Sequence, residues 1–242
     1  MMTPKEISRR LETGFAVLAG GSRTASHRQK TLEATIDWSY QLLTEEERRL
    51  LRRLAVFAGA FSIDAVESVC SGAELPTEAL LDQLGPLVAK SLVQQVDDRY
   101  RCLDTIRAYA RAKLEQAGEA ASVINRHSAS YLALAESRQP GELAAWLDRM
   151  QEEHDDLRAA LGWCISSDPE TGARMASALY DFWLVRGYGS EAYQFLEQLK
   201  DRMPEDSPLG ALVLLNAAAF AYTAGDLDAA SERIEAGIRA AR

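Results

Sequence analysis

Signature motifs of nucleotide- and metal-dependent enzymes are absent from this sequence. It contains no GxxxxGK[ST] phosphate loop, no GxGxxG after a strand, no HExxH and no CxxC. The three histidines, His27, His127 and His154, have no nearby cysteine or serine in a triad-like setting. The carboxylates fall on charged helix faces, where solvation is the default, and His154 is predicted to be a capping or surface residue. We therefore predict that the chain is not an enzyme and holds no metal ion.

Cysteine and long apolar runs are also scarce. Cys70, Cys102 and Cys164 lie far apart, without metal-ligand spacing, and are predicted to be buried thiols, which fits a reducing compartment. The longest apolar runs, 211–215 and 217–222, are too short to cross a membrane. The sequence opens without a signal-peptide pattern, so we expect a cytoplasmic protein with no membrane partner.

Basic residues are too few in the second half of the chain to balance the acidic ones. Residues 1–117 carry 16 basic and 16 acidic side chains, whereas residues 118–242 carry 11 and 20, which accounts for the whole net charge of −9. Because nucleic acids are polyanions, the second half is a poor candidate for binding them. The balanced charge of the first half excludes neither an acidic nor a basic partner.

Helical periodicity alternates with short polar breaks through the first 90 residues. Residues 19–30, AGGSRTASHRQK, are rich in Gly, Ser and basic side chains and are predicted to be a linker. Thr44 and Glu47 have the spacing of a capping box, and Ser62 is a second N-cap candidate. The predicted helices cover residues 4–18, 31–43, 45 to about 59, 62–70 and 76–90.

Four arginines follow three glutamates within the helix predicted from residue 45. Arg48 and Arg49 lie three or four residues beyond Glu45 and Glu46, the spacing at which opposite charges pair on a helix surface, and Arg52 and Arg53 follow one turn later. The preferred interpretation is a solvated face on which these charges pair with one another. A phosphate-binding patch is the alternative.

Residues 91–114, SLVQQVDDRYRCLDTIRAYARAKL, are predicted to form a β-hairpin that leads directly into a helix. Strand-type residues lie on both sides of a polar turn, Asp97–Arg99. From Asp104 the apolar residues recur at helical spacing, so Asp104 is predicted to be the N-cap. Helices followed by a hairpin and a closing helix are typical of a winged helix. The strand-type residues are Leu92, Val93 and Val96 before the turn and Tyr100, Cys102 and Leu103 after it.

The helix predicted before the hairpin, PTEALLDQLGPLVAKS, would have to read DNA, and Lys90 is its only cation. Base and phosphate contacts come mainly from Arg, Lys, Asn and Gln, so direct DNA binding is not expected. One cluster near the hairpin could still supply a basic face. Its members are Arg99, Arg101, Arg107, Arg111 and Lys113.

From residue 121 onward every segment has helical periodicity. YDFWLVRGYGSEAYQFLEQL and LNAAAFAYTAGDLDAASERIEAGI align with Gly187 on Gly225 and Leu196 on Ile234, a unit of helix, glycine turn and helix that recurs about every 38 residues. This period is near that of tetratricopeptide repeats (TPR). Because such arrays usually end in a polar capping helix, further repeats are expected beyond the sequence. The predicted helices are 128–136, 142–152, 154–165, 172–185, 191–203, 209–223 and 227–240.

The predicted fold class is therefore mainly α: a winged-helix domain with a small β-hairpin, followed by an α-solenoid of TPR-like helix pairs. Four aromatic residues of the repeats, Trp146, Trp163, Trp183 and Tyr188, are candidates for contacts on the repeat surface. Aromatic residues at helical spacing more often belong to the core, so burial is the preferred interpretation.

Three stretches carry a resemblance to a known family. They are TLEATIDWSYQLLTEEERRLLRRLAVFAGAFSIDAVESVC, LVAKSLVQQVDDRYRCLDTIRAYARAKL and HDDLRAALGWC. In their order and spacing, and in the WSY and TIRAYA strings, they resemble the region after the nucleotide-binding core of bacterial signal-transduction ATPases with numerous domains (STAND). These NB-ARC-like proteins occur among LuxR-type and antibiotic-regulatory transcription factors. The resemblance covers roughly Ser22 to Ile165.

The resemblance implies three parts: a lid remnant and linker over 1–30, a winged-helix domain over 31–117, and a truncated array of TPR-like repeats over 118–242. In that family an ATPase core binds ADP or ATP, the winged helix locks the closed state, and the repeats receive the inducer. The core's phosphate loop is not in this sequence, so no cofactor is expected in this chain, and ADP or ATP is expected in the core.

The family's Met-His-Asp nucleotide-sensing motif corresponds to Cys102, Leu103 and Asp104. Leu103 replaces the histidine that would approach the phosphate, and Asp104 either has a switching role or only caps its helix. Our leading hypothesis is a regulatory fragment in which the winged helix is an intramolecular latch on the ATPase core, and the repeats bind a protein or small-molecule inducer. The alternatives are a DNA-binding winged-helix regulator whose repeats mediate dimerisation and, more weakly, an enzyme.

Overall fold

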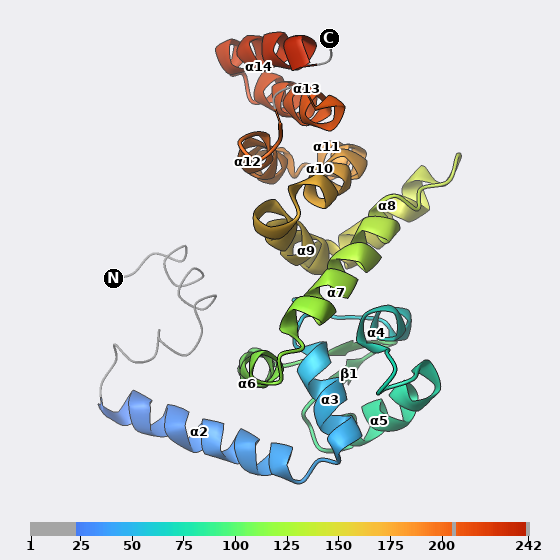
Figure 1. Ribbon diagram of the computed structural model, residues 1–242, viewed down its shortest axis with the longest axis vertical. Helices are drawn as coiled ribbons and strands as arrows, with labels where there is room; N and C mark the ends of the chain where they lie inside the picture. The colour runs from blue at the N-terminus through green and yellow to red at the C-terminus, as the bar shows by residue number, and fades with distance from the viewer. Residues whose placement is uncertain (1–22, 205–206, 241–242) are drawn as a thin grey trace. The chain divides into compact units, whose positions relative to one another are not determined.

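The computed structural model describes residues 23–204 and 207–240, which form two compact units (Figure 1). Unit 1 comprises the chain up to Val56 together with Ala60–Val123. Unit 2 comprises Phe57–Gly59 together with Ile124–Arg242. A three-residue segment of the first half of the sequence therefore belongs structurally to the second unit. The predicted helix 4–18 lies outside the described residues.

Unit 1 contains helices, a two-stranded hairpin and a closing helix, in the predicted order. Its elements are α2 (Arg23–Gln41), α3 (Glu45–Leu54), α4 (Ile63–Cys70), α5 (Thr77–Ala89), β1 (Gln94–Val96), β2 (Arg99–Arg101) and α6 (Asp104–Gln116). The capping box is confirmed, since the Thr44 hydroxyl accepts the Glu47 N–H at 3.2 Å and the Glu47 carboxylate accepts the Thr44 N–H at 2.9 Å. Ser62 caps α4 through the N–H of Ala65.

The hairpin is shorter than predicted. Its two-residue turn consists of Asp97 and Asp98, and Asp97 has a φ of 54°, in the left-handed region that Asp tolerates better than most residues. Val96 pairs with Arg99, so Arg99 belongs to β2 and not to the turn. Phe61 extends the pairing through two backbone hydrogen bonds with Tyr100, of 2.8 and 2.9 Å. The wing thus has a third short partner, contributed by the chain that precedes α4.

Apolar side chains from the helices of unit 1 and from the segments beside its strands meet in a core, whereas β1 itself has no buried residue. Leu92 and Val93 were predicted as strand residues, but they lie before β1 and are buried in this core. The largest contributors are Leu50, Leu51, Leu54, Phe61, Leu75, Leu80, Leu84, Leu87 and Leu114.

The predicted linker is wrong where it can be checked. Residues 23–30 form the first turns of α2, which continues through the predicted 31–43 helix to Gln41. No glycine or proline interrupts this stretch, so a polar sequence of moderate helix propensity can extend the helix that follows it. The remaining linker residues, 19–22, lie outside the described part of the chain.

Unit 2 is built from helices joined by turns, and its described residues include no strand. The helices are α7 (Ala120–Ala135), which begins in unit 1, then α8 (Leu143–Glu152), α9 (His154–Ser167), α10 (Pro169–Ala178), α11 (Tyr180–Arg186), α12 (Gly189–Lys200), α13 (Pro208–Thr223) and α14 (Leu227–Ala240). Figure 1 shows α9 to α14 following one another within this unit. The helix predicted over 172–185 is two helices, divided at Leu179. The mainly α fold with one small hairpin is confirmed.

Two glycines end helices at equivalent places in the proposed repeat. Gly187 and Gly225 have φ values of 80° and 83°, which only glycine adopts without strain. Each is followed by a second helix, so the aligned sequence units correspond to helix pairs. Gly237 lets α14 approach α13 closely, because a Cβ there would lie 3.2 Å from the Leu215 side chain.

Polar contacts join side chains about one repeat apart in unit 2. We call these contacts rungs. They are Glu136 with Arg174, Asp148 with Arg186, His154 with Glu191, and Glu197 with Arg233, at separations of 38, 38, 37 and 36 residues. The recurring separation means that each helix pair presents its charges to the next one in nearly the same register.

Candidate functional site

The three residues predicted to correspond to a nucleotide-sensing motif, Cys102, Leu103 and Asp104, lie where β2 passes into α6. The Cys102 side chain is buried, and burial raises the pKa of its thiol to about 12, so it is a structural thiol. Leu103 is exposed and occupies the N-cap position. Asp104 is therefore the first helical residue and not the predicted N-cap, because the backbone turns into the helix one residue earlier.

Asp104 keeps a favourable electrostatic position nonetheless. Its exposed carboxylate lies in the first turn of α6, where the helix dipole favours a negative charge, and it accepts a hydrogen bond from Arg107 at 3.0 Å. Leu103 and Asp104 are thus the two members of the motif whose side chains a partner could reach.

The candidate basic face is largely occupied by contacts within unit 1. Arg99 donates to the Ala60 carbonyl, Arg107 to Asp104, and Arg111 lies 3.5 Å from Glu115. The Lys113 ammonium lies over the rings of Tyr40 and Tyr109 and 3.6 Å from Asp37. The fifth member, Arg101, is exposed at the end of β2. Four of the five cations are thus engaged by groups of unit 1.

Lys90, the one cation of the predicted DNA-reading helix, is also committed. Its ammonium donates to both carboxylate oxygens of Glu47 at 2.7 Å. Glu47 is buried and is itself part of the capping box of α3. The rest of α5 offers acidic and apolar side chains, including Glu78, Asp82 and the half-exposed Leu81. This helix has no cationic surface with which to approach a phosphate backbone.

The arginines of α3 are only partly a solvated, self-paired face. Arg48 lies 3.9 Å from Glu45, but Arg52 and Arg53 are buried and bind Glu119, at 2.9 and 2.8 Å. Glu119 lies more than 60 residues away, so i,i+4 spacing alone could not identify this contact. Burial raises the pKa of Glu119, but the hydrogen bonds from Arg53 and Arg52 outweigh burial and hold the pKa below its usual value.

The WSY and TIRAYA strings meet at a junction between α2 and α6. The rings of Tyr40 and Tyr109 are in an edge-to-face arrangement with centroids 5.5 Å apart. The Tyr109 hydroxyl donates to Asp37 at 2.5 Å, and burial together with this bond raises the pKa of Tyr109. A pocket of about 420 Å³ lies beside the junction and is lined by Asp37, Tyr109 and Lys113 among others. The sequence alone did not predict that these two strings contact each other.

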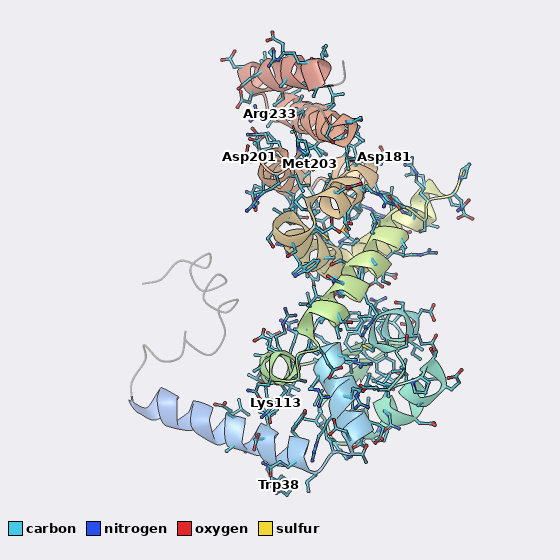
Figure 2. The ribbon with its side chains drawn as sticks, viewed as in Figure 1. Trp38, Lys113, Asp181, Asp201, Met203 and Arg233 are labelled. Carbon is cyan, nitrogen blue, oxygen red and sulfur yellow. The ribbon has the colours of Figure 1, made fainter. Side chains whose placement is uncertain are left out.

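Trp38, the first residue of the WSY string, lies on the side of α2 away from α6 (Figure 2). It is 63% exposed, and Leu42, one turn later, is also exposed. The two aromatic residues of this string therefore differ in burial: Tyr40 packs inside unit 1, and Trp38 lies on the surface. This difference follows from helical periodicity, because Ile36 and Tyr40 lie one turn apart on the buried side of α2 and Trp38, halfway between them in sequence, does not.

An acid titration can test the junction. The hydrogen bond from Tyr109 is the main reason that the pKa of Asp37 lies below its usual 3.8, with Lys113 adding to the effect. Its stabilising contribution is therefore complete above about pH 3.8 and is lost as pH falls through the lower folded value. In Tyr109→Phe we expect the Asp37 carboxyl resonance, followed by NMR, to titrate closer to 3.8. Tyr100→Phe is the control, and an equal effect of both variants would contradict this assignment.

The four aromatic candidates of unit 2 have different surroundings. Trp146 and Trp183 are buried, so a role in surface contacts is wrong for both. Trp163 is half-buried and lines a pocket of about 570 Å³ with Leu132, Ser128 and Arg174. Tyr188 is half-buried, and its hydroxyl contacts Gln151. Only Trp163 and Tyr188 are available to a ligand on the repeats.

Two histidines of unit 2 each contact a carboxylate and pack against aromatic rings. His154 is neither a free surface residue nor a cap, because its Nε2 lies 2.7 Å from Glu191 and its ring packs on Tyr188. His127 is buried with its Nε2 3.0 Å from Asp156, a carboxylate that is also buried. Sequence analysis treated the carboxylates as solvated, and only the fold reveals these partners. Within residues 23–204 and 207–240, no three His, Cys, Asp or Glu side chains form a metal-binding group.

Comparison with known proteins places a domain family on unit 1. Residues 43–115 match a winged helix-turn-helix domain family. Unit 1 is a winged helix. The match begins just before α3 and ends in α6, so it includes the hairpin and the sensing position. It leaves α2 and nearly all of unit 2 outside its range. None of the described helices is long and apolar enough to span a membrane.

Similarity to curated relatives extends beyond the winged helix. The chain is 42% identical over 206 residues to a protein of Mycobacterium tuberculosis (strain H37Rv) that is named as a candidate HTH-type transcriptional regulator, and an equal match occurs in Mycobacterium bovis. These alignments cover 82% of this chain and 23% of the relatives. An uncharacterised protein of Mycobacterium tuberculosis is 38% identical over 131 residues, which are 52% of this chain and 33% of that protein. No solved structure matches.

Proposed function

We propose that this chain is the regulatory part of a transcription regulator, in which the winged helix binds protein and the helix pairs of unit 2 act as the sensor. The observation that carries this proposal is the pairing of Lys90, which directly follows α5, with the buried Glu47, because it neutralises the one cation of the predicted DNA-reading helix. The similarity to proteins named as regulators supports the setting. The chain itself is assigned no catalytic role.

The partner we propose for the winged helix is an ATPase core of the same protein. A core that binds ADP or ATP would be held in its resting state by the winged helix, and a ligand on the TPR-like repeats would shift the equilibrium by preferring the open form. Exposed Leu103 and Asp104 at the start of α6 are the residues proposed to face the core. The resemblance to STAND ATPases and the 38-residue register of the rungs support this arrangement.

Calorimetry with the separately expressed core tests the latch. We expect tighter binding with ADP than with a non-hydrolysable ATP analogue, and Asp104→Ala is expected to remove this difference while the protein stays folded. Asp98→Ala, at the hairpin turn, is the control because it deletes an equally exposed carboxylate outside the sensing position. Absence of binding in both nucleotide states would refute the latch.

A DNA-binding winged helix is the second candidate, and the name of the matched domain family favours it. Arg99 and Arg101 on the hairpin would then supply the phosphate contacts. Fluorescence anisotropy with duplex DNA at low ionic strength separates the two functions, because phosphate contacts weaken steeply with salt. We expect no saturable binding. Salt-dependent binding that Arg101→Ala weakens would favour DNA recognition and overturn the protein-binding role.

A further inference from the structure

One buried carboxylate holds residues 57–59 within unit 2. Oδ1 of Asp156 accepts the backbone N–H of Ala58 at 2.7 Å, and Oδ2 accepts that of Gly59 at 3.2 Å. Oδ1 also lies 3.0 Å from Nε2 of His127. Asp156 is only 1% exposed, so water does not compete for these charge-assisted hydrogen bonds. We call Asp156, His127 and the residues 57–59 that they contact the clasp.

Aromatic side chains close the clasp on its other sides. Phe57 is 1% exposed, and its ring meets that of His127 edge to face with centroids 5.5 Å apart. The ring of Tyr131 also packs against that of His127, with centroids 4.6 Å apart, and the Tyr131 hydroxyl donates to Glu153 at 3.0 Å. The segment is therefore held by both its backbone and its one large side chain.

The clasp also fixes which residue can follow Ala58. A Cβ added to Gly59 would lie 3.1 Å from Cβ of Asp155 and 3.4 Å from Oδ2 of Asp156. The first distance is shorter than an ordinary contact, so a side chain at this position would push the segment away from α9. Glycine at this position lets the backbone approach closely enough for its N–H to be accepted.

The clasped segment is continuous on both sides with parts of the winged helix. It follows α3, which ends at Leu54. It precedes Phe61, whose backbone pairs with Tyr100 of the wing. The Ala60 carbonyl between them accepts a hydrogen bond from Arg99 of the same strand. Movement of residues 57–59 would therefore be transmitted along the chain to the wing through two or three residues.

We propose that Asp156 is a positioning residue that couples unit 2 to the wing through this segment. A rearrangement of α7 or α9 that withdraws the carboxylate releases the N–H groups of Ala58 and Gly59. The pairing of Phe61 with Tyr100 then loosens, and the wing leaves the conformation in which it binds its partner. This coupling rests on the proposed function, in which unit 2 receives the signal.

Hydrogen exchange in the full chain tests the coupling. In Asp156→Asn we expect the amides of Ala58 and Gly59 to exchange about 10- to 100-fold faster, since each loses a hydrogen bond to a charged group. The amides of Phe61 and Tyr100 are expected to accelerate with them, while those of α13 and α14 stay unchanged. Asp155→Asn is the matched control, because it makes the same change at the neighbouring, exposed position.

Two outcomes would overturn the proposal. Faster exchange at Ala58 and Gly59 with no change at Phe61 and Tyr100 would show a local clasp without coupling. Faster exchange throughout unit 2 would show a stability role only. If Asp156→Asn does not fold, Gly59→Ala disturbs the clasp sterically with the charge retained, and the same amides are measured. Neither DNA nor the ATPase core is present in this experiment, so its failure is distinct from failure of the proposed function.

Discussion

Replacing Glu119 with alanine is expected to destabilise unit 1 by about 3 kcal/mol or more, because removal of one partner from a buried ion pair leaves an uncompensated charge. In this case two guanidinium groups lose their carboxylate. The side chains of Arg52 and Arg53 are 11% and 8% exposed, so solvent cannot replace it fully. Their remaining partners are the neutral Tyr40 hydroxyl and Cys70 carbonyl, together with the exposed carboxylates of Glu45 and Glu74, which lie farther away, at 3.4 Å from Arg52 and 4.0 Å from Arg53.

Glu74 provides the control for this substitution. Its carboxylate lies 4.0 Å from Arg53 and 3.3 Å from Arg49, but its side chain is 66% exposed. Exposed pairs contribute about 0–1 kcal/mol, so Glu74→Ala is expected to change stability little. Urea unfolding followed by circular dichroism, with hydrogen exchange to assign the transition to unit 1, measures both variants. Equal losses would mean that the Glu119 pairs behave as surface pairs.

Replacing Trp183 with alanine is expected to cost unit 2 about 3–5 kcal/mol, the usual penalty for emptying a core aromatic site. Trp183 is 1% exposed and packs between Phe195 and Phe220, each with ring centroids at 6.4 Å. These neighbours belong to α12 and α13, so the cavity would open between successive helix pairs. The loss is expected as weakened hydrogen-exchange protection in α11 to α13.

Trp163→Ala is the matched control, because its half-buried ring lines the 570 Å³ pocket and is not enclosed by the core. We expect a loss well below that of Trp183→Ala, since a partly exposed side chain leaves a smaller cavity and less newly exposed apolar surface. Thermal unfolding of both variants makes the comparison. A larger loss for Trp163 would reverse our assignment of core and surface tryptophans.

Features that act within three or four residues could be predicted from the sequence. The capping box of Thr44 and Glu47, the Ser62 cap and the two-stranded hairpin all depend on neighbours along the chain, and each is present. The break at Leu179 was not predictable in the same way, because no glycine or proline lies between Gly172 and Gly187.

The candidate sites depended on contacts that no local pattern reveals. Glu119 contacts Arg52 from 67 residues away, and Asp156 contacts Ala58 from 98 residues away. A charged residue in a helical sequence is normally assigned to the solvent side, so the burial of Arg52, Arg53 and Asp156 contradicts the local pattern. Buried charges can be recognised only once the fold supplies their partners, and for this reason the contacts of Arg52 and Arg53 with Glu119 and the clasp were not predicted.

The rungs of unit 2 also constrain the length of the chain. An α-helix turns about 100° per residue, so one residue inserted in α11 would rotate Arg186 away from Asp148 while Arg174 of α10 stayed opposite Glu136. Insertions and deletions inside these helices would break the alignment of every later helix pair. Length changes during evolution are therefore expected to collect between α7 and α8, where residues 136–142 join two helices without regular structure.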